Sequence, residues 1–441
     1  MRIDIHPGAR TVIDRLRVAG FEAYAVGGCV RDALLGRTAD DWDICTSARP
    51  EQTERVFSDL KTIDVGRKHG TIAVLLDRKQ YEITTFRSDG SYEDARHPTS
   101  VSFDTTLSGD LMRRDFTINA MAAGVDGEVV DLFGGKSDLE NRIIRCVGDP
   151  SARFSEDALR ILRALRFAST LGGFDLDGAT ASAARKLSPL IEKISGERIL
   201  VELTKLLCGV DAERILLEYP DVLAAAIPEI APCVGFEHRN SWHCFDVWEH
   251  ICRTIALAPP EPQVRLALLF HDIAKPQCAV EKPNGHRSFH GHAQAGEPIT
   301  RARLDALHAS KALRERTAEL VLMHDDPLSP DRALVGRYLR KLGAEGFFQL
   351  CEVELADALA HNMEIEGART RVSNVRATAE LARRMLAENA PYAPSMLAIR
   401  GDELDVPPSE RGKLLERLCD DLLSGEVENE RSALLERAKQ Y

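Results

Sequence analysis

The chain has 441 residues and a formal net charge of −12, with 44% apolar and 29% charged residues. This composition is typical of a folded globular protein of about three domains, and it excludes disordered and fibrous classes. The acidic balance argues against a general polyanion-binding surface, so contacts with nucleic acid would have to come from local basic groups.

The sequence also limits the compartment. No apolar run approaches the roughly 18 residues that a membrane-spanning helix needs, and residues 1–4 lack a signal-peptide pattern. The ten cysteines are scattered without a CxxC pair, which fits free thiols in a reducing environment. We therefore expect a cytoplasmic protein with no membrane partner.

The first third of the chain alternates between helical and extended patterns. Apolar spacing predicts a helix over 12–18, a strand over 24–26 and a helix over 50–60. Two further apolar runs, 71–76 and 81–86, predict a β-hairpin around an intervening polar turn.

The polar segment 87–110 follows this hairpin, and loops of that length usually have a function. From about residue 155 onward, nearly everything has helical periodicity. Glycine or proline clusters interrupt it at 172–173, 228–232, 259–262 and 391–394.

The first chemical motif follows the strand predicted at 24–26. Gly27 and Gly28 let backbone N–H groups approach an anionic ligand. The next residues can begin a helix whose N-terminus favours phosphate, with Arg31 as a charged donor. This order of residues indicates the start of a nucleotidyl-transfer site.

Two acidic residues continue the motif. Asp41 and Asp43 are two apart, so in a strand their carboxylates point to the same side. Crowded carboxylates repel unless a cation lies between them, and Mg²⁺ with substrate phosphates suits that arrangement. Glu82, in the second strand of the predicted hairpin, is a candidate third catalytic carboxylate. An exposed acid on a half-buried strand is the alternative for Glu82.

Two adjacent arginines precede the apolar run that begins at Phe116. Arg113 and Arg114 can hold a triphosphate through charge-assisted, bidentate hydrogen bonds. Asp115 then either orients an arginine or caps a helix.

Residues 155–167 form an amphipathic helical pattern. Its leucines pack inward, whereas Asp157, Arg160 and Arg163 share a polar side at three-residue spacing. Cytosine and adenine each present an amino donor beside a ring-nitrogen acceptor. The acceptor-only Asp157 and donor-only Arg160 complement those edges and mismatch uracil and guanine. Taken alone, the segment also fits an ordinary ladder of salt bridges.

In combination, these motifs closely resemble the bacterial class II tRNA nucleotidyltransferase/poly(A) polymerase family over roughly residues 20–235. The motifs are Gly-Gly-x-Val-Arg-Asp, Asp-Trp-Asp, Thr-Thr-Phe-Arg, Arg-Arg-Asp-Phe-Thr-Ile-Asn-Ala-Met and Glu-Asp-x-x-Arg-x-x-Arg-Ala-x-Arg-Phe. The resemblance implies Asp41 and Asp43 as Mg²⁺ ligands and tRNA as the acceptor. Its implied nucleotide contacts are Gly28, Arg31 and Arg114 at the triphosphate, Asp157 and Arg160 as the base template, and Arg163 and Arg166 nearby. It also implies that Glu156 fixes the template and that Ser195–Arg198, with Glu202, begins the neck helix.

The second half resembles the HD metal-dependent phosphohydrolase superfamily. The implied core ligands are His250, His271, Asp272 and Asp357, and the positions implied for a second metal are His292 and His324. His243 competes with His250 for the role of first ligand. Imidazole and carboxylate ligands suit Mn, Fe, Ni, Co or Zn, and a metal-bound water becomes a nucleophile at neutral pH.

We therefore predict an α+β N-terminal nucleotidyltransferase head with a small mixed sheet, followed by all-α neck, HD and tail regions. The predicted boundaries are 1–145 for the head, 146–235 for the neck with the template, 236–370 for the HD domain and 371–441 for a tRNA-binding tail.

The leading functional hypothesis is a Mg²⁺-dependent enzyme that adds C, C and A to tRNA from CTP and ATP without a nucleic-acid template. CC-adding, A-adding and poly(A)-adding enzymes are the alternatives within the class. Segment 87–110 looks complete, which opposes CC addition alone, and the acidic chain opposes a poly(A) polymerase. An HD phosphohydrolase that retains the head only for RNA binding is a different class. No obligate protein partner is inferred.

Overall fold

The computed structural model describes residues 2–89, 101–103 and 106–441. Most of the predicted functional loop 87–110 therefore lies outside the described residues. The chain forms two compact units. The first comprises residues 1–206 and 221–226, and the second comprises 207–220 and 227–441.

A seven-stranded sheet forms the centre of the first unit, with strand order β3-β4-β5-β2-β1-β8-β9. The strands are β1 (Ala23–Val26), β2 (Ile44–Thr46), β3 (Lys61–Gly66), β4 (Thr71–Leu76), β5 (Lys79–Thr85), β8 (Met121–Ala123) and β9 (Val129–Asp131). β2 pairs with β5 in parallel, whereas β1 pairs with both β2 and β8 antiparallel. The predicted mixed sheet is confirmed.

The predicted hairpin forms from β4 and β5, and its turn is tighter than expected. Only Asp77 and Arg78 join the strands, with φ of +50° and +64°, so β5 begins at Lys79. Positive φ at both central residues matches the right-handed twist of the paired strands. The hairpin therefore follows from a two-residue turn rather than a four-residue loop.

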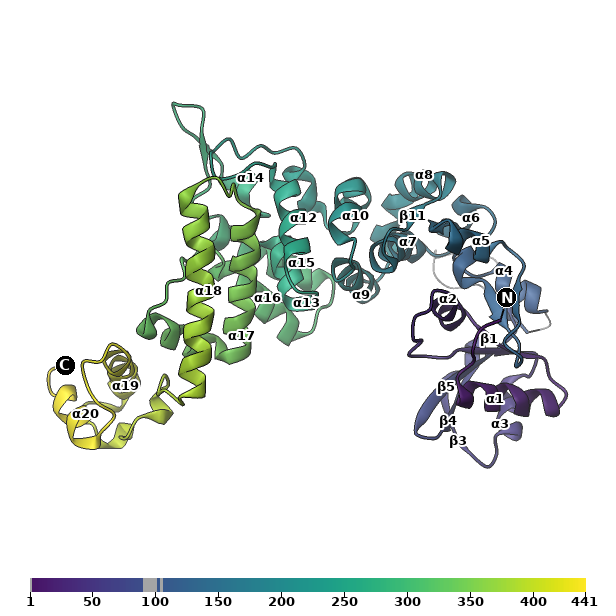
Figure 1. Ribbon diagram of the computed structural model, residues 1–441, viewed down its shortest axis with the longest axis horizontal. Coiled ribbons are helices and arrows are strands. Elements are labelled where there is room, and N and C mark those ends of the chain that lie inside the picture. The colour runs from purple at the N-terminus through teal and green to yellow at the C-terminus, as the bar shows by residue number, and fades with distance from the viewer. Residues whose placement is uncertain (1, 90–100, 104–105) are drawn as a thin grey trace. The chain divides into compact units, whose positions relative to one another are not determined.

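Two helices, α1 (Pro7–Val18) and α3 (Pro50–Val56), pack against strands of this sheet (Figure 1). The helix predicted over 50–60 ends at Val56, because the chain turns there into β3, which was not predicted. Ile63 and Val65 alternate with Thr62 and Asp64 in β3, but the alternation is short and no residue of the strand is buried.

The rest of the first unit is mainly helical. Its helices are α2 (Gly28–Leu34), α4 (Leu107–Met112), α5 (Gly135–Glu140), α6 (Pro150–Glu156), α7 (Leu159–Leu171), α8 (Gly178–Leu187), α9 (Gly196–Leu207) and α11 (Pro220–Ala226). Short ladders join β6 (Ser88–Asp89) to β7 (Val101–Ser102) and β10 (Ile143–Ile144) to β11 (Asp175–Leu176). The helix start at Gly196 agrees with the expected neck helix.

The prediction of a single helix over 155–167 is wrong. α6 ends at Glu156, Asp157 is extended with φ −144° and ψ 102°, and α7 begins at Leu159. The Asp157 carboxylate accepts the Leu159 N–H at 3.1 Å, and such local bonds compete with a continuous helix. Asp157 is thus not on a helical face shared with Arg160, although Leu159 and its apolar partners are buried as expected.

The second unit is almost wholly helical. Its helices are α10 (Ala212–Glu218), α12 (Val247–Leu257), α13 (Pro262–Phe270), α14 (Lys275–Cys278), α15 (His292–Ala306), α16 (Lys311–Met323), α17 (Arg332–Ala360), α18 (Glu366–Ala387), α19 (Pro408–Leu423) and α20 (Arg431–Ala438). Between residues 240 and 370, all of which are described, the only strand pair is antiparallel β12 (Val280–Glu281) and β13 (Arg287–Ser288). α17 and α18 run side by side (Figure 1).

Two further expectations concern helices and thiols. Within the described residues, every helix is too short or too polar to span a bilayer. All ten cysteines are free, and seven of them are buried. Burial raises the pKa of the Cys45 thiol above its ordinary range and that of Cys146 to about 12, so the buried thiols stay protonated.

Candidate active sites

Three carboxylates of the first unit gather where β2 begins, beside the middle of β5. Asp43 directly precedes β2, and the parallel register with β5 sets it beside Glu82. Asp41 and Asp43 were expected to lie in a strand, but both precede β2, which begins at Ile44. Desolvation and the negative charges of Glu82 and Asp41 raise the pKa of Asp43, against the opposing charge of Arg114. Such crowding of acids is what a bound cation relieves.

The predicted triphosphate contacts lie near one another. Gly28 is the first residue of α2, and the preceding Gly27 has φ +82°. A Cβ added at Gly27 would lie 3.1 Å from Arg114 Nη1, so the arginine approaches the start of the helix closely. The buried Asp110 carboxylate accepts from Arg114 Nη2 at 3.2 Å. Arg31 donates two bonds of 2.9 Å to Asp32.

The two arginines predicted beside the nucleotide meet at a buried aromatic ring. Arg163 donates to Asp115 Oδ2 from Nε and Nη2, at 2.8 and 2.6 Å. Arg166 forms an ion pair of 2.5 Å with Glu202. The guanidinium carbons of Arg163 and Arg166 lie 5.4 and 3.8 Å from the centre of the Phe167 ring. Asp115 therefore orients an arginine, which was one of its two expected roles.

Each member of the predicted template pair has its own partners. Arg160 donates to Glu156 at 2.8 Å and to the Arg113 carbonyl at 3.0 Å. Asp157 accepts from Arg198 Nη2 at 2.8 Å. Glu156 thus holds Arg160 as expected, whereas the contact between Asp157 and Arg198 was not anticipated. Arg198 lies in the first turn of α9, far along the chain from Asp157, so no local pattern could reveal the contact.

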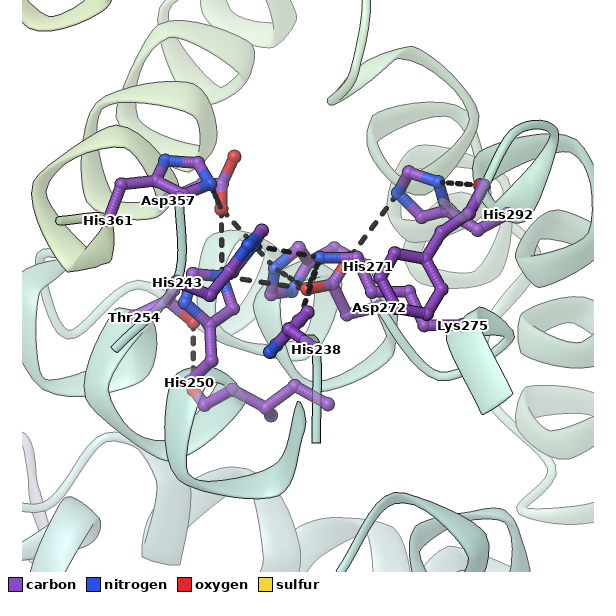
Figure 2. Close-up of polar contacts among 12 residues, drawn as sticks. His238, His243, His250, Thr254, His271, Asp272, Lys275, His292, Asp357 and His361 are labelled. Carbon is purple, nitrogen blue, oxygen red and sulfur yellow. Dashed lines mark hydrogen bonds and ion pairs between the residues drawn. The ribbon is translucent and has the colours of Figure 1, made fainter. Parts of the chain in front are cut away.

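A buried cluster of imidazoles and carboxylates lies in the second unit (Figure 2). His250 comes from α12, His271 and Asp272 follow α13, and Asp357 lies in α17. His250 Nε2 is 2.9 Å from Asp357 Oδ1 and 3.5 Å from Asp272 Oδ2. His271 Nε2 is 3.3 Å from Asp272 Oδ2. The structure therefore brings the four predicted core ligands together.

The orientation of the histidines suits a metal. His271, His292 and His324 each place Nδ1 at 2.7–2.8 Å from the backbone carbonyl three residues earlier. A proton on Nδ1 leaves Nε2 with its lone pair towards the cluster, as metal-binding histidines require. His271 Nε2 is buried and has no hydrogen-bond partner among the described residues. The residues present therefore fit a transition metal.

The residues predicted for a second metal lie against the first cluster. His292 Nε2 is 3.1 Å from His324 Nε2 and 3.3 Å from Asp272 Oδ1. Ligand atoms of these three residues all lie within 4.8 Å of one another. Asp272 therefore has one oxygen towards each group of histidines.

Two basic residues of this cluster, Lys275 and His238, were missed by sequence analysis, whereas His243 was considered as an alternative first ligand. Lys275 Nζ lies 2.6 Å from Asp272 Oδ2 and 3.1 Å from Nε2 of both His238 and His243. Burial and the Lys275 charge lower the pKa of His238 to about 3, so it accepts as a neutral imidazole. The geometry places His250, and not His243, against Asp357. The three-residue spacing of Asp272 and Lys275 was a usable signal, but the loop carrying His238 gave none.

Charges within the cluster favour a cation. Burial alone would lower the pKa of His271, but Asp272 and Asp357 outweigh it and raise that pKa to about 10. The same carboxylates attract a metal ion to His271 Nε2, so protons and metal compete for this atom.

A cavity of about 170 Å³ opens beside the cluster. Its lining includes His292, His324 and two cations, Lys275 and Arg371. Arg371 Nη1 is 3.0 Å from Asp357 Oδ2. Cationic groups beside metal-binding side chains suit a phosphate ester.

Family models match three parts of the chain. They are the poly A polymerase head domain at residues 23–145, the probable RNA and SrmB-binding site of polymerase A at 173–233, and the HD domain at 242–367. The fold is thus that of a nucleotidyltransferase head followed by an RNA-binding region and an HD domain.

The curated relatives that match this chain are described as CCA-adding enzymes. The CCA-adding enzyme of Streptococcus gordonii is 53% identical over 211 residues, which are 47% of this chain and 52% of that protein. That of Streptococcus suis is 53% identical over 199 residues, 45% and 49% of the two chains. The chain thus spans about half the length of the curated relatives it matches.

The crystal structure of the Bacillus stearothermophilus CCA-adding enzyme in complex with CTP is similar over nearly the whole chain. Its TM-score is 0.72 at 31% identity, and the match covers 99% of this chain and 98% of that one. The chain belongs to the tRNA nucleotidyltransferase/poly(A) polymerase family.

Proposed function

We propose that this protein is a cytoplasmic CCA-adding enzyme that adds C, C and A to tRNA 3′ ends from CTP and ATP, without a nucleic-acid template. The observation that carries the proposal is the crowding of Asp43 with Asp41 and Glu82 beside Arg114. That arrangement suits a cation and a polyphosphate at one place. The similarity to a CTP-bound CCA-adding enzyme over nearly the whole chain supports the same substrate class.

In this mechanism Asp41 and Asp43 hold Mg²⁺, with Glu82 as the third carboxylate. Bound Mg²⁺ would stabilise charge on the attacking tRNA hydroxyl oxygen and on the departing pyrophosphate. Arg31 and Arg114, with the backbone at Gly28, hold the triphosphate, and Arg163 and Arg166 shape the adjoining surface. Each arginine is already fixed by a carboxylate or an amide, so little freedom is lost on binding.

Asp157 and Arg160 are proposed to select the base. An acceptor beside a donor complements the amino and ring-nitrogen groups of cytosine and adenine. Glu156 accepts a hydrogen bond from the Arg160 guanidinium, and Arg198 donates one to Asp157 Oδ2. The carboxylate therefore presents its remaining lone pairs in a restricted direction.

The alternatives within the class remain CC-adding, A-adding and poly(A)-adding enzymes. One experiment distinguishes them: incubate purified protein with tRNA lacking CCA, tRNA ending in C and tRNA ending in CC, each with a single nucleotide. A CCA-adding enzyme extends the first two with CTP only and the third with ATP only. Extension of only the first two substrates, or long A tails, would contradict the proposal.

Substitution of the carboxylates tests the site itself. We expect Asp43→Asn to reduce both C and A addition about 1000-fold, because metal ions contribute several kcal/mol of charge stabilisation. tRNA binding should remain, as measured by gel shift. Asp40→Asn, at an exposed neighbouring acid, is the matched control. Near-normal addition by the Asp43 variant would remove the assignment.

We propose a second activity for the HD domain, metal-dependent hydrolysis of a phosphomonoester or a 2′,3′-cyclic phosphate at damaged RNA ends. The supporting observation is the buried His271 Nε2, which faces Asp272 and Asp357 without a hydrogen bond and lies beside a cavity whose lining includes Lys275 and Arg371. His250, His271, Asp272 and Asp357 would hold the metal, with His292 and His324 available for a second ion. Protein that carries no metal and shows no metal-stimulated hydrolysis would instead have an HD domain that supports the tRNA structurally.

A further inference from the structure

Trp242 differs from the other two tryptophans of the chain in being exposed. Its exposed fraction is 41%, against 6% for Trp42 and 2% for Trp248. The residue is nonetheless held in place. Its carbonyl accepts the Asn362 N–H at 2.7 Å, and its own N–H donates to Asn240 Oδ1 at 3.0 Å.

The indole ring of Trp242 also packs in a defined position. A Cβ added at Gly367 would lie 2.6 Å from Trp242 Cη2, so the ring rests on the first turn of α18 where a side chain is missing. Exposed aromatic area that is rigidly held loses little entropy when it binds a ligand. The geometry is thus that of a preformed platform.

The platform stands directly beside the HD cavity. The Trp242 ring meets the His361 ring edge to face, with 6.0 Å between centroids and an interplanar angle of 80°. His361 lines the cavity, and its Nε2 is 3.9 Å from Asp357 Oδ1 (Figure 2). His243, which directly follows Trp242 in the sequence, also lines the cavity. Trp242 therefore lies one ring outside the cavity wall.

We infer that Trp242 stacks against the nucleobase of the molecule whose phosphate enters the HD cavity. Every base has a π face that an exposed indole can cover, and such stacking stabilises binding without requiring a particular sequence. The substrate class is then a nucleoside phosphate, such as the terminal nucleotide of an RNA, and not a base-free phosphate ester. This inference rests on the proposed phosphohydrolase activity.

The reaction balances as a hydrolysis. A water oxygen bonds to phosphorus, the bond between phosphorus and the ribose oxygen breaks, and a water proton passes to that oxygen. The products are a nucleoside end with a free hydroxyl and inorganic phosphate. The base on Trp242 takes no part in these bonds, so the residue affects binding of the substrate rather than its conversion.

The test compares two substrates with metal-loaded, full-length protein: adenosine 3′-monophosphate and glycerol 2-phosphate. Trp242→Leu should raise KM for the nucleotide roughly 5- to 150-fold, the range that corresponds to loss of base stacking, with little change in kcat. The glycerol ester should be unaffected, and Trp242→Phe should recover much of the loss. Equal effects on the two substrates, or none, would overturn the inference.

A binding measurement separates this inference from the proposed hydrolysis. Adenosine 3′-monophosphate should quench the fluorescence of Trp242 in wild-type protein and not in Trp242→Phe. If the wild type hydrolyses neither substrate, the phosphohydrolase proposal fails. The fluorescence measurement still shows whether Trp242 stacks against the base. Leu257→Ala, at another exposed apolar residue of the second unit, is the matched control. Absence of quenching in the wild type contradicts base stacking.

Discussion

Asp157 and Arg160 depend on partners from different parts of the chain, Arg198 for one and Glu156 for the other. Whether each side chain donates or accepts hydrogen bonds therefore depends on its own functional group, and the two side chains do not share a helical face. A carboxylate cannot donate and a guanidinium cannot accept, so uracil and guanine each leave unpaired polar groups at this pair. Under the proposed base selection, nucleotide choice is therefore a property of these two side chains.

Replacing both with amides should relax that choice. In Asp157→Asn/Arg160→Gln, each amide can either donate or accept, so UTP and GTP lose their penalty. We expect the ratio of kcat/KM for CTP over UTP to fall about 5- to 150-fold, because an unpaired polar edge costs roughly 1–3 kcal/mol. Glu140→Gln, at an exposed acid of α5, serves as control. Unchanged discrimination would assign the pair to an ordinary salt-bridge role.

Asp115 gives a pH-dependent contribution to stability. Burial alone would raise its pKa, but Arg163, Asn119 and the Phe116 N–H outweigh burial and lower it from 3.8 to about 2. A lowered folded-state pKa stabilises the fold above the unfolded value of 3.8, by about 2 kcal/mol. That contribution is lost as pH falls from about 4 to about 2.

The measurement is urea unfolding of wild type and Asp115→Asn across this pH range. The difference between their unfolding free energies should be constant above about pH 4 and should shrink towards pH 2. A difference that does not depend on pH would mean that the Asp115 carboxylate has no charged partner in the folded protein.

Among the helices, Arg265 of α13 connects the C-terminal end of α12 to the segment that contains Leu207 and Gly209. Its guanidinium donates to the carbonyls of Ala258 and Pro259, where α12 ends, and to those of Leu207 and Gly209. These carbonyls have no intrahelical partner, and a cation at a helix C-terminus also interacts favourably with the helix dipole.

Arg265→Met should therefore destabilise the second unit by about 3 kcal/mol, since several carbonyls lose a charged donor. Arg265→Lys, which keeps the charge but has fewer directed donors, should recover part of the loss. Chemical denaturation followed by circular dichroism checks both variants. A methionine variant as stable as wild type would show that water replaces the guanidinium without cost.

Elements with strong periodicity were predictable, and elements set by tertiary contacts were not. α1 and the β4–β5 hairpin follow from apolar spacing. β3 was missed because its apolar alternation is limited to Ile63 and Val65. The break at Asp157 was missed because one side-chain hydrogen bond, to the Leu159 N–H, decides it. In the HD cluster, the predicted ligands lie on recognisable motifs, whereas His238, a partner of Lys275, comes from an irregular loop.

At the scale of the whole molecule, each candidate site lies within its own compact unit. Asp41, Asp43 and Glu82 belong to the first unit, and His271 and Asp272 belong to the second. No residue of either site is supplied by the other unit among the described residues. The two proposed activities should therefore be separable by mutation.

His271→Ala/Asp272→Ala should lose bound metal and phosphohydrolase activity while keeping CCA addition, because two of the four converging ligands are removed and the head is untouched. Metal content by elemental analysis, phosphate release and tRNA extension measure the three properties on one preparation. Asp43→Asn should give the reverse pattern, with hydrolysis kept and addition lost, and so controls for general misfolding. If the HD variant retains its metal but loses CCA addition, the second unit acts on tRNA binding and the sites are not independent.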